Sequence, residues 1–222
     1  MRETATRTWR GATAEERQAE RRSRLLEAGL DAIGSDGWEA TTVRMVCRTA
    51  GLTERYFYEA FADRDALLCA VFEMVREEAT LAVFGTLGAI PETDVRARAS
   101  AAINAGLGLL LDDPRKGRVL LIEGASCAAL QERRAEGMAT TAALLAQLAP
   151  EFVKGKLDPT DAHLTAIALV GAQTELVAAY ITGTIDVSRE RLLEHITELH
   201  FAAAGVTSTP RPRRTRSRSG AV

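Results

Sequence analysis

Features that indicate an exported protein, a membrane protein or an enzyme are scarce in this sequence of 222 residues. Its 3 cysteines, Cys47, Cys69 and Cys127, form no CxxC or Cys/His pattern that would hold zinc. Such cysteines are typical of small buried side chains in a reducing compartment, with a redox switch as the alternative. The N-terminus lacks the apolar segment of a secretory signal, and no apolar run reaches membrane-spanning length. We therefore expect a cytoplasmic protein without membrane contact.

Aromatic residues and net charge are also low, at 5% and −2. Hydrophobic residues make up 46% of the chain, and alanine and leucine dominate them, which indicates a core of helices packed on helices. A net charge near zero argues against a protein that coats nucleic acid through bulk positive charge. Contact with DNA must then come from local arginine clusters.

A stretch from Thr41 to Leu68 has the pattern of two short helices, a tight turn and the start of a third helix. Thr42 is a suitable N-cap, because its hydroxyl can accept a hydrogen bond from the first turn. Gly51 can adopt the left-handed conformation that ends a helix. Phe57 and Phe61 lie four residues apart and can pin the second helix to a core. The stretch therefore predicts a helix-turn-helix, whose second helix enters a DNA major groove.

Two motifs in this region are specific: AGLTxxYFYxxFxDRDALL spans Ala50–Leu68, and GWxATTVR spans Gly37–Arg44. Together they resemble the N-terminal signature of TetR-family transcriptional regulators, over roughly the first third of the chain. The sequence departs from the family pattern at Arg64, where lysine is usual, and at Tyr56, where a small residue is common. The resemblance implies an all-α fold with a three-helix head and a larger helical body that binds ligand and dimerises.

Helical periodicity predicts about nine helices and no convincing strand. We expect the fourth helix to end near Phe84, before a loop from Gly85 to Pro91, and the seventh to end before Pro150. The predicted organisation is a flexible N-terminal arm (1–13), a helix-turn-helix domain (14–62), a ligand-binding and dimerisation domain (63–204) and a disordered tail rich in arginine, proline and serine (205–222).

The resemblance also suggests which head residues contact DNA. Thr42, Tyr58 and Arg64 match positions that usually hold the phosphate backbone, and Arg44 and Thr53 are candidate helpers. Each threonine is alternatively a helix cap and nothing more, and Tyr58 is alternatively a core residue between head and body.

Arg55 and Tyr56 are the candidates for reading base edges. Arginine can bond a guanine through two hydrogen bonds, and tyrosine can pack on a thymine methyl group. Two such heads on a two-fold axis would read a palindromic operator in double-stranded DNA, with the recognition helices about 34–36 Å apart.

The body is expected to enclose a cavity for a small, largely apolar inducer. Its lining candidates, each alternatively an ordinary core residue, are Phe84, Ile103, Leu107, Met138, Gln173 and Tyr180. The last two helices are the expected homodimer surface, because small residues such as Ala168 and Gly171 let helix axes approach closely. An intrachain core is the alternative use of these residues.

The most consistent function is a ligand-responsive repressor that binds a palindromic operator as a dimer and is released by its inducer. The alternatives are an activator of the same family, or a helical small-molecule-binding or interaction protein without specific operator binding. Glu194, His195, Glu198 and His200 lack a second cluster that would complete a metal site. No catalytic constellation is visible, so neither an enzyme, a cofactor nor a metal is expected.

Overall fold

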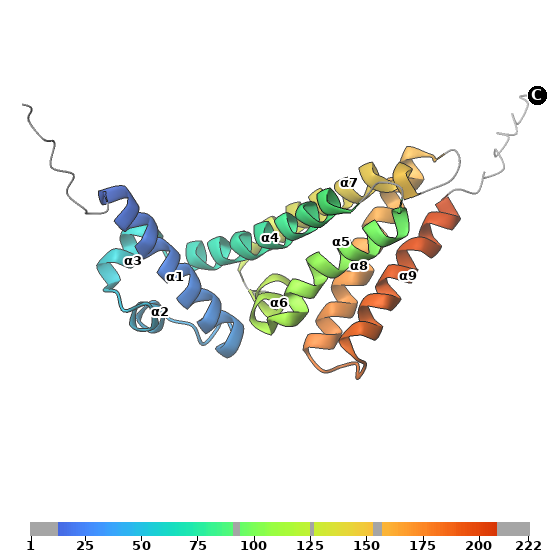
Figure 1. The fold of residues 1–222 in the computed structure, drawn as a ribbon. Helices are drawn as coiled ribbons and strands as arrows, with labels where there is room; N and C mark the ends of the chain where they lie inside the picture. The colour runs from blue at the N-terminus through green and yellow to red at the C-terminus, as the bar shows by residue number, and fades with distance from the viewer. Residues whose placement is uncertain (1–12, 91–93, 125–126, 153–156, 208–222) are drawn as a thin grey trace, which may run out of the picture. The chain divides into compact units, whose positions relative to one another are not determined.

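The computed structural model describes residues 13–90, 94–124, 127–152 and 157–207 (Figure 1). Within these residues the chain forms nine α-helices and no strand, which confirms the predicted all-α fold. The helices are α1 (Ala14–Asp36), α2 (Val43–Ala50), α3 (Glu54–Ala60), α4 (Arg64–Ala89), α5 (Val95–Asp112), α6 (Pro114–Leu121), α7 (Ala128–Phe152), α8 (Pro159–Ile181) and α9 (Arg189–Thr207). Residues 1–12 of the expected arm and 208–222 of the expected tail lie outside the described residues.

The helices pack into two compact units. The head unit comprises Met1–Ala79 and Leu109–Arg133, and the body unit comprises Thr80–Gly108 and Arg134–Val222. Helices α4, α5 and α7 therefore each contribute residues to both units. The domain boundary expected between residues 62 and 63 stays a prediction.

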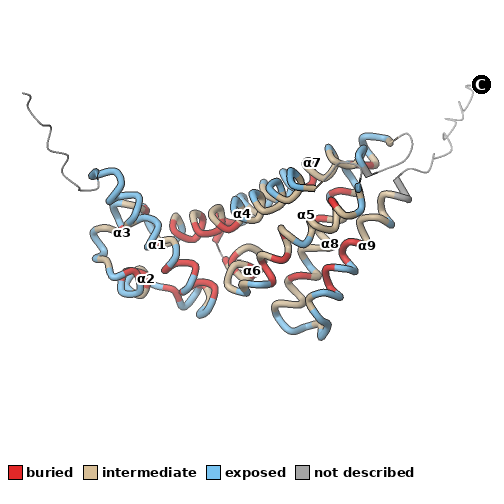
Figure 2. The backbone as a smooth tube through the Cα atoms, in the orientation of Figure 1, coloured by how far each residue is buried: buried red, intermediate tan, exposed pale blue. Residues whose placement is uncertain are grey.

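The core of the head unit is built from apolar side chains on the inner faces of four helices. Figure 2 shows the buried residues along the C-terminal half of α1 and the first half of α4. Leu25, Ile33, Val46, Phe57 and Leu67 are all fully buried there. Burial of a side chain of this size stabilises a fold by roughly 1.5–3 kcal/mol. The head is thus held together mainly by contacts of α1 with α2, α3 and α6, and Leu67 and Val71 of α4 approach α1 closely at Gly29.

Helix α6 lies close against the C-terminal half of α1. A Cβ atom added at Gly34 would stand 2.7 Å from Arg115 Cα, so only glycine permits this approach. Arg115 donates to Asp31 at 3.2 Å and to Asp113 at 2.8 Å, and its guanidinium holds the pKa of Asp113 below the usual range. After α6, Glu123 accepts a hydrogen bond of 2.8 Å from the backbone N–H of Trp38. These contacts fix both the end of α1 and the following loop against α6.

Two helix ends differ from the sequence prediction. Helix α4 continues through Gly85 to Ala89, so the predicted loop there is wrong as far as Ala89. A Cβ added at Gly85 would meet nothing within 4 Å, so this side of the helix is open. Glycine there lowers helix stability only through its low helix propensity. Helix α7 likewise runs past Pro150 to Phe152. Pro150 lies in the last turn, so only two helical residues follow it.

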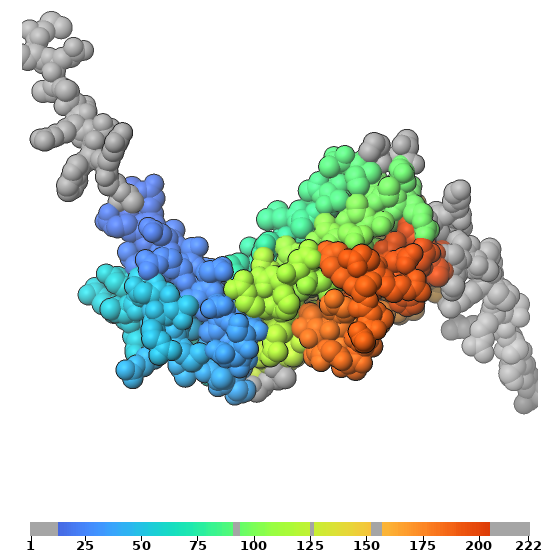
Figure 3. Space-filling view, turned by 60° about the horizontal axis from the view of Figure 1, so that its bottom comes forward, coloured from blue at the N-terminus to red at the C-terminus, as the bar shows by residue number. Residues whose placement is uncertain are grey.

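In the body unit, α8 and α9 pack side by side, and Figure 3 shows their orange and red atoms together on one face. Val177 of α8 and Leu193 and Ile196 of α9 are buried. Helix α9 begins just after Ser188, whose Oγ accepts a hydrogen bond from the N–H of Arg191 at 3.2 Å.

Helix α8 is also the one helix, within the described residues, whose length and composition would allow it to cross a membrane. The expectation that no apolar run reaches membrane-spanning length was therefore too strict. The polar residues around Glu175 still leave the most apolar window of α8 with a mean hydropathy of 1.5. Only 17% of its most apolar window is buried inside the chain. One such helix is weak evidence for a membrane, since an interface helix has the same composition.

Candidate nucleic-acid interface

The turn between α2 and α3 has the geometry of the predicted helix-turn-helix. Thr42 Oγ1 accepts a hydrogen bond of 3.2 Å from the N–H of Met45 and so caps α2. Gly51 ends that helix in the left-handed conformation, with φ of 61°. Arg24 of α1 donates to the carbonyl of Ala50, which ties the turn to the first helix. The cap and the glycine were both predicted correctly from the sequence.

Thr53 differs from Thr42 in what its hydroxyl does. It occupies the N-cap position of α3, but its side chain makes no capping hydrogen bond, and the residue is exposed. The structure thus favours the cap role for Thr42 and leaves the Thr53 hydroxyl available to an external acceptor such as a phosphate.

This difference predicts opposite behaviour of two alanine variants. Thr42→Ala is expected to lower the free energy of unfolding by about 1 kcal/mol, because α2 loses its cap. Thr53→Ala is expected to leave unfolding within about 0.5 kcal/mol of wild type while weakening DNA binding, since it removes a hydroxyl without a partner in the chain. Urea unfolding and a DNA titration of both variants check this. Equal destabilisation by the two substitutions would contradict it.

Helix α3 buries one side and exposes the other. Phe57 is fully buried and its ring lies 5.7 Å from that of Phe61, as the sequence predicted. Arg55 lies on the outer side with 84% of its side chain exposed, and its Nε donates to Glu59 at 3.0 Å. Tyr58 is 57% exposed, so the structure does not support the alternative that it is a core residue.

Tyr56 is half-buried beneath an arginine of α1. The guanidinium carbon of Arg21 stands 4.6 Å from the centre of the Tyr56 ring, and Arg22 stands 5.0 Å from that of Phe61. A cation over an aromatic face is attracted by about 0.5–1 kcal/mol at an exposed site. The α1 arginines therefore support the recognition helix, in addition to any contact with a polyanion.

Arg64 has a structural role that the sequence analysis did not identify. Its Nη1 donates to the carbonyl of Thr41 at 2.8 Å, and its guanidinium lies 4.0 Å from the centre of the Trp38 ring. These contacts fasten the loop before α2 to the start of α4. They also leave other N–H groups of Arg64 for the predicted phosphate contact. Arg44 is exposed on α2.

The six candidates for the inducer cavity all belong to the body unit. Phe84 and Met138 are exposed by 48% and 43%, and the other four, Ile103, Leu107, Gln173 and Tyr180, are half-buried. Their role in ligand binding stays a prediction.

No group of three or more histidine, cysteine, aspartate or glutamate residues in the described part of the chain could hold a metal ion. On α9, Glu194 pairs with Arg191 at 3.0 Å, and Glu198 pairs with Arg96. His200 bonds the carbonyl of Ile196 at 2.8 Å, and burial lowers its pKa below the ordinary value. These carboxylates and this imidazole are thus engaged in contacts within the chain.

Residues 25–71, which contain the helix-turn-helix, match the family model described as bacterial regulatory proteins, tetR family. The HTH-type transcriptional regulator BetI of Klebsiella pneumoniae (strain 342) is 30% identical over 83 residues, which are 37% of this chain and 43% of BetI. BetI of Escherichia coli O17:K52:H18 is 29% identical over 87 residues, 39% of this chain and 45% of that protein. The chain thus spans less than half the length of these curated relatives.

Solved structures extend the likeness of the fold to most of the chain. The fatty acid degradation regulator FadR from Bacillus halodurans has a TM-score of 0.68 at 16% identity, over 82% of this chain and 94% of FadR. A TetR-like transcriptional regulator from Rhodococcus sp. RHA1 has a TM-score of 0.60 at 20% identity, over 83% and 93%. At these identities the likeness shows the fold alone.

Proposed function

We propose that this chain, whose residues 25–71 match the TetR-family model, is a repressor that binds a palindromic operator as a dimer and is released by a small, largely apolar inducer. Its place of action would be the cytoplasm, where the DNA is. The observation that carries the proposal is the outer face of α3. There Thr53, Arg55 and Tyr58 are exposed on a helix that Phe57 anchors to the head core.

This face has the groups that DNA recognition requires. The Thr53 and Tyr58 hydroxyls can donate to phosphate oxygens, and the Arg55 guanidinium can bond a guanine through two N–H groups. Tyr56 adds an aromatic edge for a thymine methyl group. Phosphate contacts would fix the position of the helix, while Arg55 and Tyr56 would supply sequence preference.

The dimer is supported by the surface of α8. Leu164 and Ile167 are 57% and 48% exposed, and a Cβ added at Gly171 would meet nothing within 4 Å. Exposed apolar and small residues at helical spacing are typical of a helix-packing surface without its partner. A second copy of α8 and α9 is the proposed partner.

Release by an inducer requires only that the ligand prefers the form of the protein that does not bind DNA. A hundredfold preference corresponds to about 2.7 kcal/mol of coupling. The contacts of Arg115 of α6 with Asp31, and of Glu123 just after α6 with Trp38, join this segment to the head helices, and α7, the next helix along the chain, also contributes to the body unit. Such contacts are a physical route for coupling. Equal inducer affinity for free and DNA-bound protein in calorimetry would exclude this mechanism.

A gel shift with DNA from the intergenic region upstream of the protein's own gene tests the proposal. Wild type should form a discrete complex that resists competitor DNA, and Arg55→Ala should weaken it by about 5- to 150-fold, equivalent to roughly 1–3 kcal/mol. Tyr56→Ala should change the base preference. A matched control is Arg76→Ala, because Arg76 also pairs with a glutamate on its own helix, α4, and belongs neither to the α3 face nor to the proposed dimer surface.

Loss of the complex in both arginine variants would indicate nonspecific attraction, as would smearing that disappears with added salt. If wild type forms no discrete complex on this DNA, the protein should next be used to select bound fragments from genomic DNA. Failure there would favour a binding protein without an operator.

A further inference from the structure

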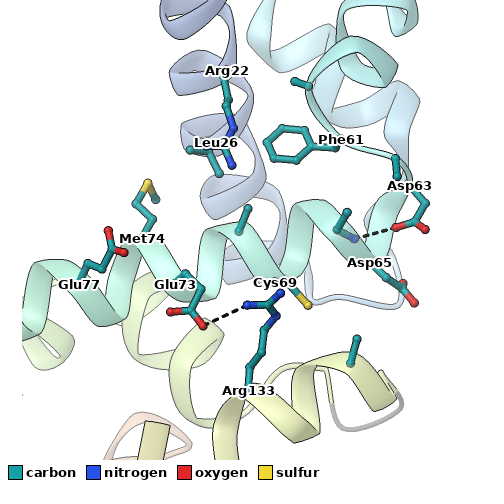
Figure 4. Close-up of a pocket in the computed structure, with 15 residues that line it drawn as sticks. Arg22, Leu26, Phe61, Asp63, Asp65, Cys69, Glu73, Met74, Glu77 and Arg133 are labelled. Atoms are coloured by element: carbon teal, nitrogen blue, oxygen red, sulfur yellow. Dashed lines mark hydrogen bonds and ion pairs between the residues drawn. The ribbon is translucent and has the colours of Figure 1, made fainter. Parts of the chain in front are cut away.

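A groove runs along the head unit on the side of α4 that the core does not use (Figure 4). Its volume is about 840 Å³, which is within the usual range of roughly 300–1,000 Å³ for small-molecule sites. Its walls come from α1, the α3–α4 connection, α4 and the first turns of α7. All lining residues belong to the head unit, so this groove is separate from the inducer candidates in the body unit.

The floor of the groove is apolar. Ala66, Ala70 and Met74 follow one another at intervals of four on α4, and all three are only half-buried. Leu26 of α1 adds a branched apolar side chain beside them, as Figure 4 shows. The adjacent residues of α4 that form the core, such as Val71, are fully buried. The floor is therefore apolar surface that the chain leaves accessible.

The rim of the groove carries an excess of negative charge. Four carboxylates line it, Asp63, Asp65, Glu73 and Glu77, against the two guanidinium groups of Arg22 and Arg133. An excess of one sign around a concave apolar surface attracts ligands of the opposite charge.

Some of these charged groups already have ion-pair or hydrogen-bond partners within the described part of the chain, and others do not. Arg133 stands 3.5 Å from Glu73, which also accepts from Arg76 at 2.7 Å. Asp63 Oδ1 accepts from the N–H of Ala66 at 2.7 Å. Glu77 is exposed next to Met74 and takes part in no such contact. Glu77 is therefore the carboxylate best placed to meet an external cation.

The ring of Phe61 shows that this groove already accommodates a cation on an aromatic group. The Arg22 guanidinium occupies that position, 5.0 Å from the ring centre. Organic cations are recognised by the same combination of aromatic rings, carboxylates and apolar contacts.

We propose that the groove is a binding site for an organic cation with an apolar body, such as a quaternary ammonium or phosphonium compound. The cation would lie beside Glu77, and the apolar body would cover Met74, Ala70 and Leu26. A neutral or anionic compound of the same size lacks the attraction of Glu77 and meets the negative rim. The site would bind such cations whether or not the body unit holds an inducer.

Calorimetric titration of the full chain with tetraphenylphosphonium tests the proposal, and tetraphenylborate serves as the anion of matched size. The cation should bind saturably with one site per chain, and the anion at least tenfold more weakly. Glu77→Gln should weaken cation binding about two- to fivefold, as expected for a partly exposed charge pair. Met74→Lys should abolish it, because it covers the apolar floor and adds a positive charge.

Glu132→Gln is the matched control, since Glu132 is an exposed carboxylate next to Arg133 that does not line the groove. It should leave cation binding unchanged. The proposal is overturned if the cation does not bind saturably up to millimolar concentration, or if the anion binds as tightly. It is also overturned if Glu77→Gln and Met74→Lys, shown by thermal melting to be folded, bind the cation as wild type does.

Discussion

Replacing Ile167 with glutamate is expected to produce a monomer and to lower affinity for a palindromic operator by about 100-fold or more. Ile167 is 48% exposed on the α8 face that we propose as the dimer surface, so a single chain tolerates the change. In a dimer the two new carboxylates would be buried in an apolar contact, where an unpaired charge costs several kcal/mol. Two linked heads gain about 10²- to 10⁴-fold over one head, and a monomer loses this gain.

Sedimentation of the variant and a DNA titration measure the two effects. Val187→Glu is the matched control, because Val187 is also an exposed apolar residue but lies between α8 and α9. It should remain dimeric and bind DNA like wild type. A dimeric Ile167→Glu protein would place the dimer surface elsewhere.

Replacing Gly34 with alanine is expected to lower the free energy of unfolding by about 2–3 kcal/mol, within the range seen for overpacked cores. The added methyl group would stand 2.7 Å from Arg115 Cα, and backbone cannot rotate away as a side chain can. Helices α1 and α6 must separate, which also strains the contact of Arg115 with Asp31.

Gly85→Ala is the control, because Gly85 is another helical glycine whose added methyl group would meet nothing within 4 Å. It should stabilise the protein by about 0.5–1 kcal/mol through helix propensity. Chemical unfolding of both variants gives the comparison. If both substitutions stabilise the protein to the same extent, the close approach of α1 and α6 is not present in solution.

Features governed by near neighbours in sequence could be predicted. The cap at Thr42 and the left-handed Gly51 depend on residues within three or four positions. The continuation of α4 through Gly85 could not be predicted in this way, because glycine is a weak helix former whose tolerance depends on the surrounding space. The continuation of α7 past Pro150 could not be predicted either, because the effect of a proline on a helix depends on how many helical residues follow it.

In the candidate interface, too, the features set by near neighbours could be predicted and those set by distant residues could not. The spacing of Phe57 and Phe61 was enough to assign the inner face of α3, and hence the outward position of Arg55. The second role of Arg64 was missed because it depends on Trp38 and Thr41, more than twenty residues earlier. The sequence also could not show which of the two threonines caps its helix, because that depends on the hydrogen bonds in the folded chain.

The ion pair between Arg55 and Glu59 has a consequence for discrimination between DNA sequences. While Arg55 donates to Glu59, the carboxylate competes with any phosphate or base that approaches the guanidinium. DNA of unrelated sequence offers the Arg55 guanidinium one weak acceptor, and its phosphates repel the Glu59 carboxylate. A well-placed guanine instead offers two acceptors that can replace the glutamate. In the DNA complex that we propose, Glu59 would thereby penalise wrong partners more than the right one, which is how a charge that weakens binding overall can increase selectivity.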